Sequence, residues 1–113
     1  MKKANFLMLA VLFLISTAFV APRKMNVHEF NVKDIVGNEI ALSKYKGKTL
    51  LIVNVASKCG LTPQYEDLQA LYDTYQEHGL VVMGFPANNF MAQEPGSDEQ
   101  ISRFCTQKYG VTF

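Results

Sequence analysis

The chain has 113 residues, which is enough for one small domain. Hydrophobic residues make up 49% and charged residues 19%, a balance typical of a globular protein rather than a disordered one. The formal net charge of +1 gives no bulk electrostatic case for binding nucleic acid. Two cysteines are too few for a disulfide scaffold, and neither they nor the two histidines have metal-site spacing, so we expect no metal and no cofactor.

The first 24 residues have the pattern of a targeting segment. Two lysines precede an almost unbroken apolar stretch over residues 6–21, which has the length of a signal-peptide core and is short for a membrane span. We expect a signal peptide, and the alternatives are an uncleaved membrane anchor or a start of translation at Met25. A signal peptide predicts a secreted or periplasmic protein, and a start at Met25 predicts a cytoplasmic one. Residues 25–113 then form the domain.

The domain opens with the pattern of a short β-hairpin. Residues 27–32 alternate between apolar and polar, turn-forming residues follow at 34–38, and a second short strand is expected at 39–42. After a polar break, the nearly continuous apolar run at 49–55 predicts a strand buried on both faces, as in a parallel sheet.

A helix is expected next. Thr62 is a good N-cap and Pro63 a good first helical residue, and Gly79 is placed to end this helix. A second buried strand is predicted over residues 80–85, where the sequence is again apolar.

The remaining pattern predicts a second helix after a loop. Ser97 and Gln100 have the spacing of a capping box, and residues 109–113 are expected to lead into a further strand. The order is therefore hairpin, strand, helix, strand, helix. This order implies a right-handed βαβ unit in an α/β fold.

Cys59 is the first candidate for chemistry. It follows the carboxyl end of the first buried strand and precedes the predicted helix, where sites form in open α/β sheets. A helix amino terminus favours a thiolate, Lys58 adds a cation, and Gly60 lets backbone N–H groups approach an anionic oxygen. These features indicate a nucleophile, and the alternative is a structural cysteine buried as a small apolar residue. Cys105 has the local context of a core residue on the second helix.

The residues around Cys59 also resemble a family signature. The segment GKTLLIVNVASKCGLT over residues 47–62 is similar to the signature of the glutathione peroxidase family. The segments GFPANNF (84–90), QEPG (93–96) and YGVTF (109–113) resemble further motifs of that family. The resemblance implies a thioredoxin-like fold, of which the C-terminal strands and helix are missing here. Residues 25–113 are therefore expected to be a partial domain.

The resemblance implies a thiol peroxidase of antioxidant defence that reduces hydrogen peroxide and organic hydroperoxides. By similarity, Cys59 is the peroxidatic nucleophile, which becomes a sulfenic acid, and Gln93 donates a hydrogen bond at its sulfur. Cys105 matches the resolving cysteine, which forms a disulfide with Cys59 that thioredoxin or glutathione reduces. A redox sensor, a thiol–disulfide exchange protein and an inactive fragment are the alternatives.

The chain departs from the family pattern in three places. Ala87 and Asn89 replace a common cysteine and glutamine, and Met91–Ala92 stand where the family has glycine before the glutamine. The third departure is that the sequence stops at Phe113, before the further strands and the tryptophan–asparagine pair of the family pattern, and it contains no tryptophan. We expect a partial sequence; a chain that is complete without those strands and that pair is expected to be weakly stable and a poor peroxidase.

Overall fold

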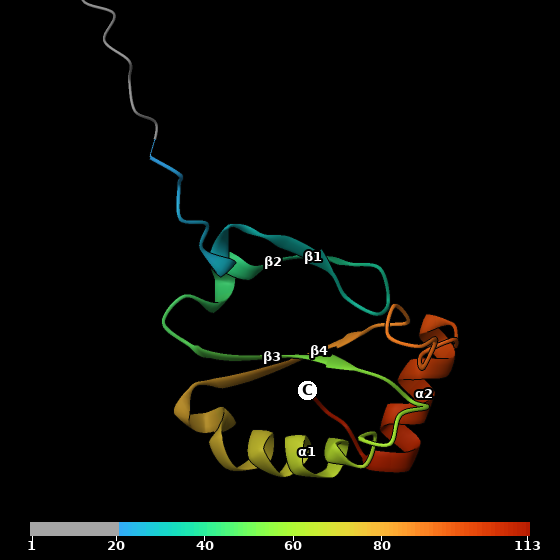
Figure 1. Ribbon diagram of the computed structural model, residues 1–113. Helices are drawn as coiled ribbons and strands as arrows, with labels where there is room; N and C mark the ends of the chain where they lie inside the picture. The colour runs from blue at the N-terminus through green and yellow to red at the C-terminus, as the bar shows by residue number, and fades with distance from the viewer. Residues whose placement is uncertain (1–20) are drawn as a thin grey trace, which may run out of the picture.

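The computed structural model of the chain describes residues 21–113 (Figure 1). Its strands form a small antiparallel sheet and a small parallel sheet, namely β1 (Asn31–Lys33) with β2 (Glu39–Ala41), and β3 (Thr49–Val55) with β4 (Leu80–Pro86). The helices are α1 (Gln64–Tyr75) and α2 (Asp98–Tyr109), with short 3-10 helices η1 (Val27–Glu29), η2 (Leu42–Tyr45) and η3 (Gln76–His78). Figure 1 shows the hairpin on one side of the parallel sheet and α1 on the other.

The predicted hairpin is confirmed, and Asp34 shapes its turn. The Asp34 carboxylate accepts hydrogen bonds from the backbone N–H groups of Val36 (3.0 Å) and Asn38 (2.8 Å), and Gly37 takes a φ of 91°. The expected strand over residues 27–32 is wrong in its first half. The Asn26 side chain accepts from the backbone N–H of His28 (3.0 Å), and this cap starts η1 there instead.

The parallel sheet agrees with the sequence prediction in its bounds. Strand β3 covers the predicted apolar run, and its partner β4 pairs with it in register from Thr49 with Leu80 to Val55 with Pro86. The expected burial on both faces is wrong for β3. Ile52 in the middle of this strand remains 47% exposed.

Helix α1 begins later than predicted. Its N-cap is Pro63, with no side-chain cap, so the expectation that Thr62 caps it is wrong. The helix continues through η3 to Gly79, whose φ of 90° ends it as predicted.

The capping box of α2 is confirmed. The Ser97 hydroxyl accepts from the Gln100 backbone N–H (3.3 Å), and the Gln100 side chain accepts from the Ser97 backbone N–H (2.9 Å). Gly110, with a φ of 62°, ends α2, and residues 111–113 continue without helix or strand.

The core is small and lies where η2, α1, β4 and α2 meet. It contains one buried apolar residue from each of these elements, namely Leu42, Tyr65, Val82 and Ile101, each no more than 5% exposed.

The chain beyond α2 is held against α1 by Gln69. The Gln69 side chain accepts from the Thr112 backbone N–H (2.8 Å) and donates to the Thr112 hydroxyl (2.7 Å). The end of α2 is thereby tied to α1.

The expectation of a signal peptide or anchor falls largely on residues 1–20, which lie outside the described residues. From residue 21 to residue 113, no helix has the length and apolar character needed to cross a membrane.

Candidate active site around Cys59

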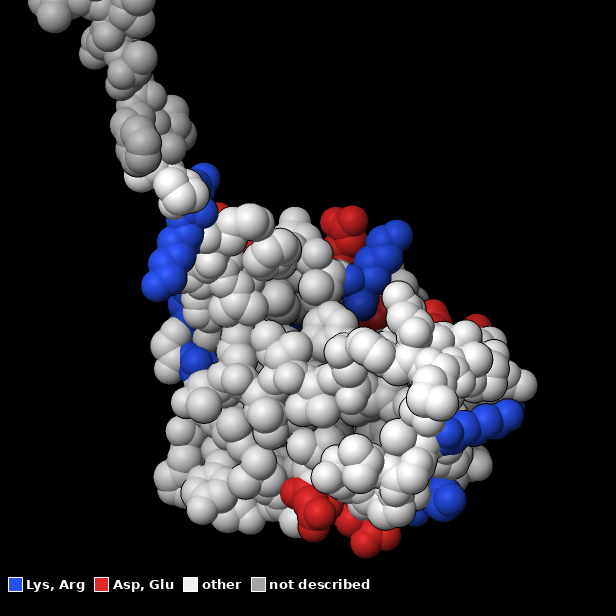
Figure 2. All heavy atoms as spheres, in the orientation of Figure 1, with Lys and Arg blue, Asp and Glu red and all other residues white. Residues whose placement is uncertain are grey.

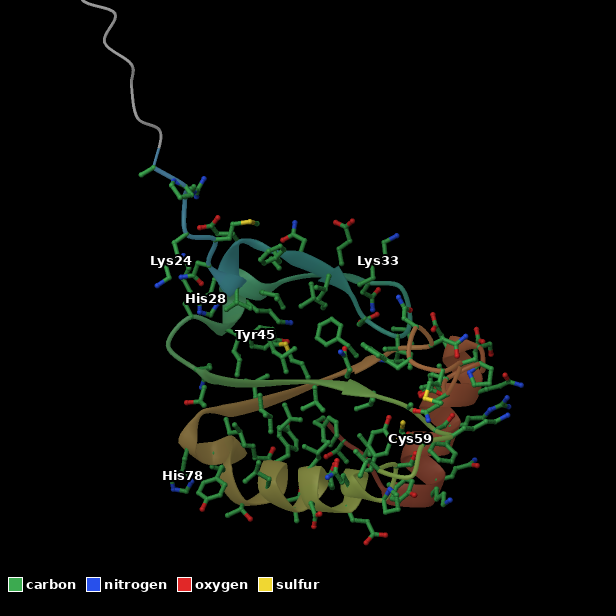
Figure 3. The ribbon with its side chains drawn as sticks, viewed as in Figure 1. Lys24, His28, Lys33, Tyr45, Cys59 and His78 are labelled. Atoms are coloured by element: carbon green, nitrogen blue, oxygen red, sulfur yellow. The ribbon has the colours of Figure 1, made fainter. Side chains whose placement is uncertain are left out.

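Cys59 lies in the loop that joins β3 to α1, at the carboxyl ends of the two parallel strands (Figure 3). The hydroxyl of Thr62, which is 7% exposed, holds this loop from inside. It accepts a hydrogen bond from the Cys59 backbone N–H (3.0 Å) and donates one to the carbonyl oxygen of Ala56 (2.8 Å). Thr62 is therefore occupied with the cysteine loop, which explains why it does not cap α1.

The half-buried thiol of Cys59 has a hydrogen-bond donor of its own. The backbone N–H of Leu61 points at the sulfur, with an N-to-Sγ distance of 3.4 Å. The sequence predicted a helix amino terminus next to Cys59, but α1 begins only at Gln64, and the N–H group that reaches the sulfur belongs to the loop.

Gln93 lines the same cavity as Cys59, although the two are far apart in sequence. Both residues line a cavity of about 210 Å³, together with apolar side chains such as Val53 and Leu68. The two loops are joined directly, because the Lys58 backbone N–H donates to the Gln93 carbonyl oxygen (3.0 Å). The structure therefore places the predicted nucleophile and the predicted donor in one pocket.

The backbone before Gln93 is strained. Met91 and Ala92 have φ values of 56° and 53°, in the left-handed region where non-glycine residues pay a steric cost of roughly 1–2 kcal/mol each. These are the positions where the sequence departs from the glycine of the family pattern. Backbone strain of this kind persists only where the surrounding structure holds it in place.

Glu94 is a site residue that the sequence reasoning missed. Its side chain is only 3% exposed, and its Oε1 atom accepts a hydrogen bond from the Ser57 hydroxyl in the cysteine loop. Its backbone N–H donates to the side-chain oxygen of Asn88 (3.0 Å), while its Oε2 atom is buried without a partner. The sequence offered one signal, an acidic residue directly after Gln93, but no periodicity marks that residue as buried.

Cys105 is not brought to Cys59. Both cysteines are free, and Cys105 lies on α2 in the wall of a second cavity, of about 560 Å³, between the hairpin, β4 and α2. Burial raises the pKa of the Cys105 thiol, and the charge of Glu94 adds to the rise. The thiol is therefore protonated at neutral pH.

Tyr65 stands between the two cavities. It is 3% exposed, and its ring contributes to the wall of each cavity and packs on Tyr109 with the ring centroids 5.4 Å apart. Burial raises the pKa of its hydroxyl strongly, and the neighbouring Cys105 thiol adds to this rise. The hydroxyl itself has no hydrogen-bond partner.

The fold defines an α/β protein of thioredoxin-like fold with a cysteine in the loop after its first parallel strand, and comparisons with solved structures agree on the fold. The crystal structure of Trgpx in apo form matches with a TM-score of 0.52 and 44% sequence identity, over 59% of this chain and 47% of that one. The structure of T. cruzi GPX1 matches with a TM-score of 0.52 and 43% identity, over 58% of this chain and 44% of that one.

Sequence comparisons identify the family. The family model described as glutathione peroxidase matches residues 27–113, so the chain belongs to the glutathione peroxidase family. The glutathione peroxidase homolog BsaA of Halalkalibacterium halodurans is 60% identical over 89 residues, which are 79% of this chain and 57% of that protein. The glutathione peroxidase-like peroxiredoxin 2 of Saccharomyces cerevisiae is 56% identical over 76% of this chain and 53% of its own length.

A third relative carries both reductants in its name. The thioredoxin/glutathione peroxidase BtuE of Escherichia coli is 57% identical over 82 residues, which are 73% of this chain and 45% of that protein. The chain thus spans about half the length of the curated relatives it matches.

Proposed function

We propose that this chain acts as a thiol peroxidase of antioxidant defence, which reduces hydrogen peroxide and organic hydroperoxides through Cys59. The observation that carries the proposal is the pocket itself. It combines a cysteine sulfur that accepts a backbone hydrogen bond with a glutamine in the same wall. The names of the relatives, which are glutathione peroxidases and peroxiredoxins, support the same reaction.

The first chemical step takes place at the sulfur of Cys59. The thiolate attacks one peroxide oxygen, the O–O bond breaks, and the sulfur becomes a sulfenic acid. The other oxygen leaves with a proton as water or an alcohol. The Leu61 N–H points at the attacking sulfur, and the side-chain amide of Gln93 donates to the negative charge that develops as the bond breaks.

The surroundings of the pocket suit an uncharged organic hydroperoxide. Leu61 and Phe90, which line the cavity, are 65% and 58% exposed. Figure 2 shows the charged side chains of the visible face mainly at its margins. An apolar rim gives the carbon chain of such a substrate a surface to contact.

Cys105 is proposed as the resolving cysteine. Its thiol would lose its proton and attack the sulfenic sulfur of Cys59, and the sulfenic hydroxyl would leave with a proton as water. Thioredoxin or glutathione would then reduce the resulting disulfide. The two cysteines line different cavities, so α2 must rearrange before they meet. Local unfolding of a helix on this scale is an ordinary motion in a small protein.

The test follows the fate of each cysteine after one equivalent of hydrogen peroxide. The reduced chain is mixed with peroxide, quenched with an alkylating reagent and mapped by mass spectrometry. We expect a Cys59–Cys105 disulfide in the native chain, and a sulfenic acid at Cys59 in the Cys105→Ser variant. Unmodified Cys59 in excess peroxide would refute the proposal, and a mixed disulfide with an added partner protein would indicate a redox sensor instead.

We also propose that residues 1–24 are a signal peptide, which makes the protein secreted or periplasmic. The support is the basic and apolar pattern of this segment and the start of the family match at residue 27. Sequencing the amino terminus of the protein recovered from cells tests the cleavage. An intact Met1 on a membrane-bound protein would show an anchor, and a start at Met25 in the cytoplasm would show that the segment is not translated.

A further inference from the structure

The most unusual group outside the predicted machinery is the carboxyl group of Glu94. Acidic side chains are almost never fully buried unless they are paired, yet Glu94 is 3% exposed. Within residues 21–113, the one salt bridge joins Arg23 to Glu29, so no cation pairs with Glu94. Its single side-chain partner is the Ser57 hydroxyl.

We propose that Glu94 is a positioning residue for the peroxidatic reaction, because it holds the Cys59 loop in register with the loop that carries Gln93. This inference rests on the proposed peroxidase function and adds a role that the pocket alone does not assign. Glu94 does not line the Cys59 cavity. It acts through Ser57, two residues before the nucleophile, and through its own neighbour Gln93.

The geometry consists of two adjacent links between the loops. The Ser57 hydroxyl donates to the Glu94 carboxyl oxygen, and the next residue, Lys58, donates its backbone N–H to the Gln93 carbonyl oxygen at 3.0 Å. Residues 57–58 are thereby bonded to residues 93–94 through one side-chain and one backbone contact. A second support comes from Asn88, whose side chain accepts from the Glu94 backbone N–H at 3.0 Å and fixes the loop after β4.

The cost of this arrangement indicates a role in function rather than in stability. A buried carboxyl group with one unpartnered oxygen is unfavourable for folding, and an apolar side chain in its place would avoid that penalty. Departures from local folding rules of this kind concentrate at functional sites. Glu94 lies within such a site, between the nucleophile loop and the strained residues Met91 and Ala92.

The positioning role has a specific chemical consequence. Attack on a peroxide needs the sulfur and the amide donor at fixed separation, and a displacement of about 1 Å is enough to slow a reaction strongly. Alkylation of the same thiolate by iodoacetamide needs only access to the sulfur. Loss of the Ser57–Glu94 link should therefore slow the reaction with peroxide and leave alkylation unchanged or faster.

The test compares these two reactions at Cys59 in the full chain. Second-order rate constants for oxidation by hydrogen peroxide and for alkylation by iodoacetamide are measured at one pH, and the ratio of the two is the readout. The variants are Ser57→Ala, Glu94→Ala and Glu94→Gln, of which the last keeps an acceptor oxygen for Ser57. The matched control is Glu99→Gln, because Glu99 accepts from Ser97 at 2.8 Å in an exposed Ser–Glu pair.

We expect Ser57→Ala and Glu94→Ala to lower the ratio about tenfold, the effect of losing one hydrogen bond of roughly 1.4 kcal/mol in the transition state. Glu94→Gln should recover most of that loss, and Glu99→Gln should change nothing. If Glu94→Ala does not fold, Ser57→Ala tests the proposal, since it removes only the hydroxyl that donates to Glu94. If the native chain reacts with peroxide and Ser57→Ala has the same ratio of rate constants, the positioning role of Glu94 is refuted and the proposed function stands. If the native chain does not react with peroxide, the proposed function is refuted as well.

Discussion

The left-handed backbone at Ala92 predicts that glycine should be the better residue at this position. With a φ of 53°, the Cβ atom of Ala92 crowds the following carbonyl oxygen, and the Ala92→Gly variant removes that atom. The same change makes the unfolded chain more flexible, which opposes the gain. The sign of the net effect therefore depends on which contribution is larger.

The magnitudes favour glycine. Relief of the left-handed conformation is worth about 1.5 kcal/mol, and the added freedom of the unfolded chain costs about 0.7 kcal/mol. We expect the free energy of unfolding to rise by about 0.8 kcal/mol, which corresponds to an increase in Tm of about 4 °C for a domain of this size.

The control is the same substitution in a helix. Ala70 is exposed on α1, where Ala70→Gly should lower the free energy of unfolding by about 1 kcal/mol. Thermal unfolding followed by circular dichroism compares the two variants with the native chain. Equal destabilisation at both positions would show that the backbone at Ala92 is not strained, and it would overturn the reasoning.

Two further predictions concern side chains that the structure shows to be unusual. Tyr65→Phe should raise the free energy of unfolding by about 1 kcal/mol, because the buried hydroxyl lacks a hydrogen-bond partner. The control Tyr75→Phe, at a 49% exposed position, should leave the free energy of unfolding unchanged. A loss of stability in Tyr65→Phe would show that the Tyr65 hydroxyl does make a hydrogen bond. Hydrogen bonds, first that from the Asn38 backbone, lower the pKa of Asp34 below its usual 3.8. Its contribution to stability is thus complete above pH 3.8 and lost as the pH falls through the lower value of the folded state. The difference in Tm between the native chain and Asp34→Ala should shrink in acid, and a constant difference would contradict this.

The regular elements could be predicted because their signals are local. Strand β3 coincides with its apolar run, and the capping box at Ser97 marks the start of α2. The placement of Cys59 at the end of a strand follows from the same local pattern. That Gln93 shares a site with Cys59 was predicted from the family resemblance, since no spacing rule links two loops that are distant in sequence.

The errors arise where side chains serve a distant contact. Thr62 fits the pattern of an N-cap, but its hydroxyl bonds to Ala56 and Cys59 instead, and the competition between these partners is decided by the folded loop. Glu94 was missed for a related reason. Its burial depends on Ser57, which lies in another loop, and a single acidic residue in a loop is ordinarily solvated.

The two hydrogen bonds between Gln69 and Thr112 have a consequence for the motion of α2. The bonds from Ser57 to Glu94 and from Lys58 to Gln93 hold the chain before this helix. The bonds between Gln69 and Thr112 hold the chain just beyond its other end, so α2 is a segment with two tethered ends. If its middle turns open, the segment becomes a closed loop rather than a free tail, and the entropy gained on opening is limited. The same tethers limit its reach, since the stretch from Gly110 back to Cys105 extends at most about 17 Å. Opening of α2 is therefore a motion of limited amplitude, and the helix can re-form while both of its ends stay in place.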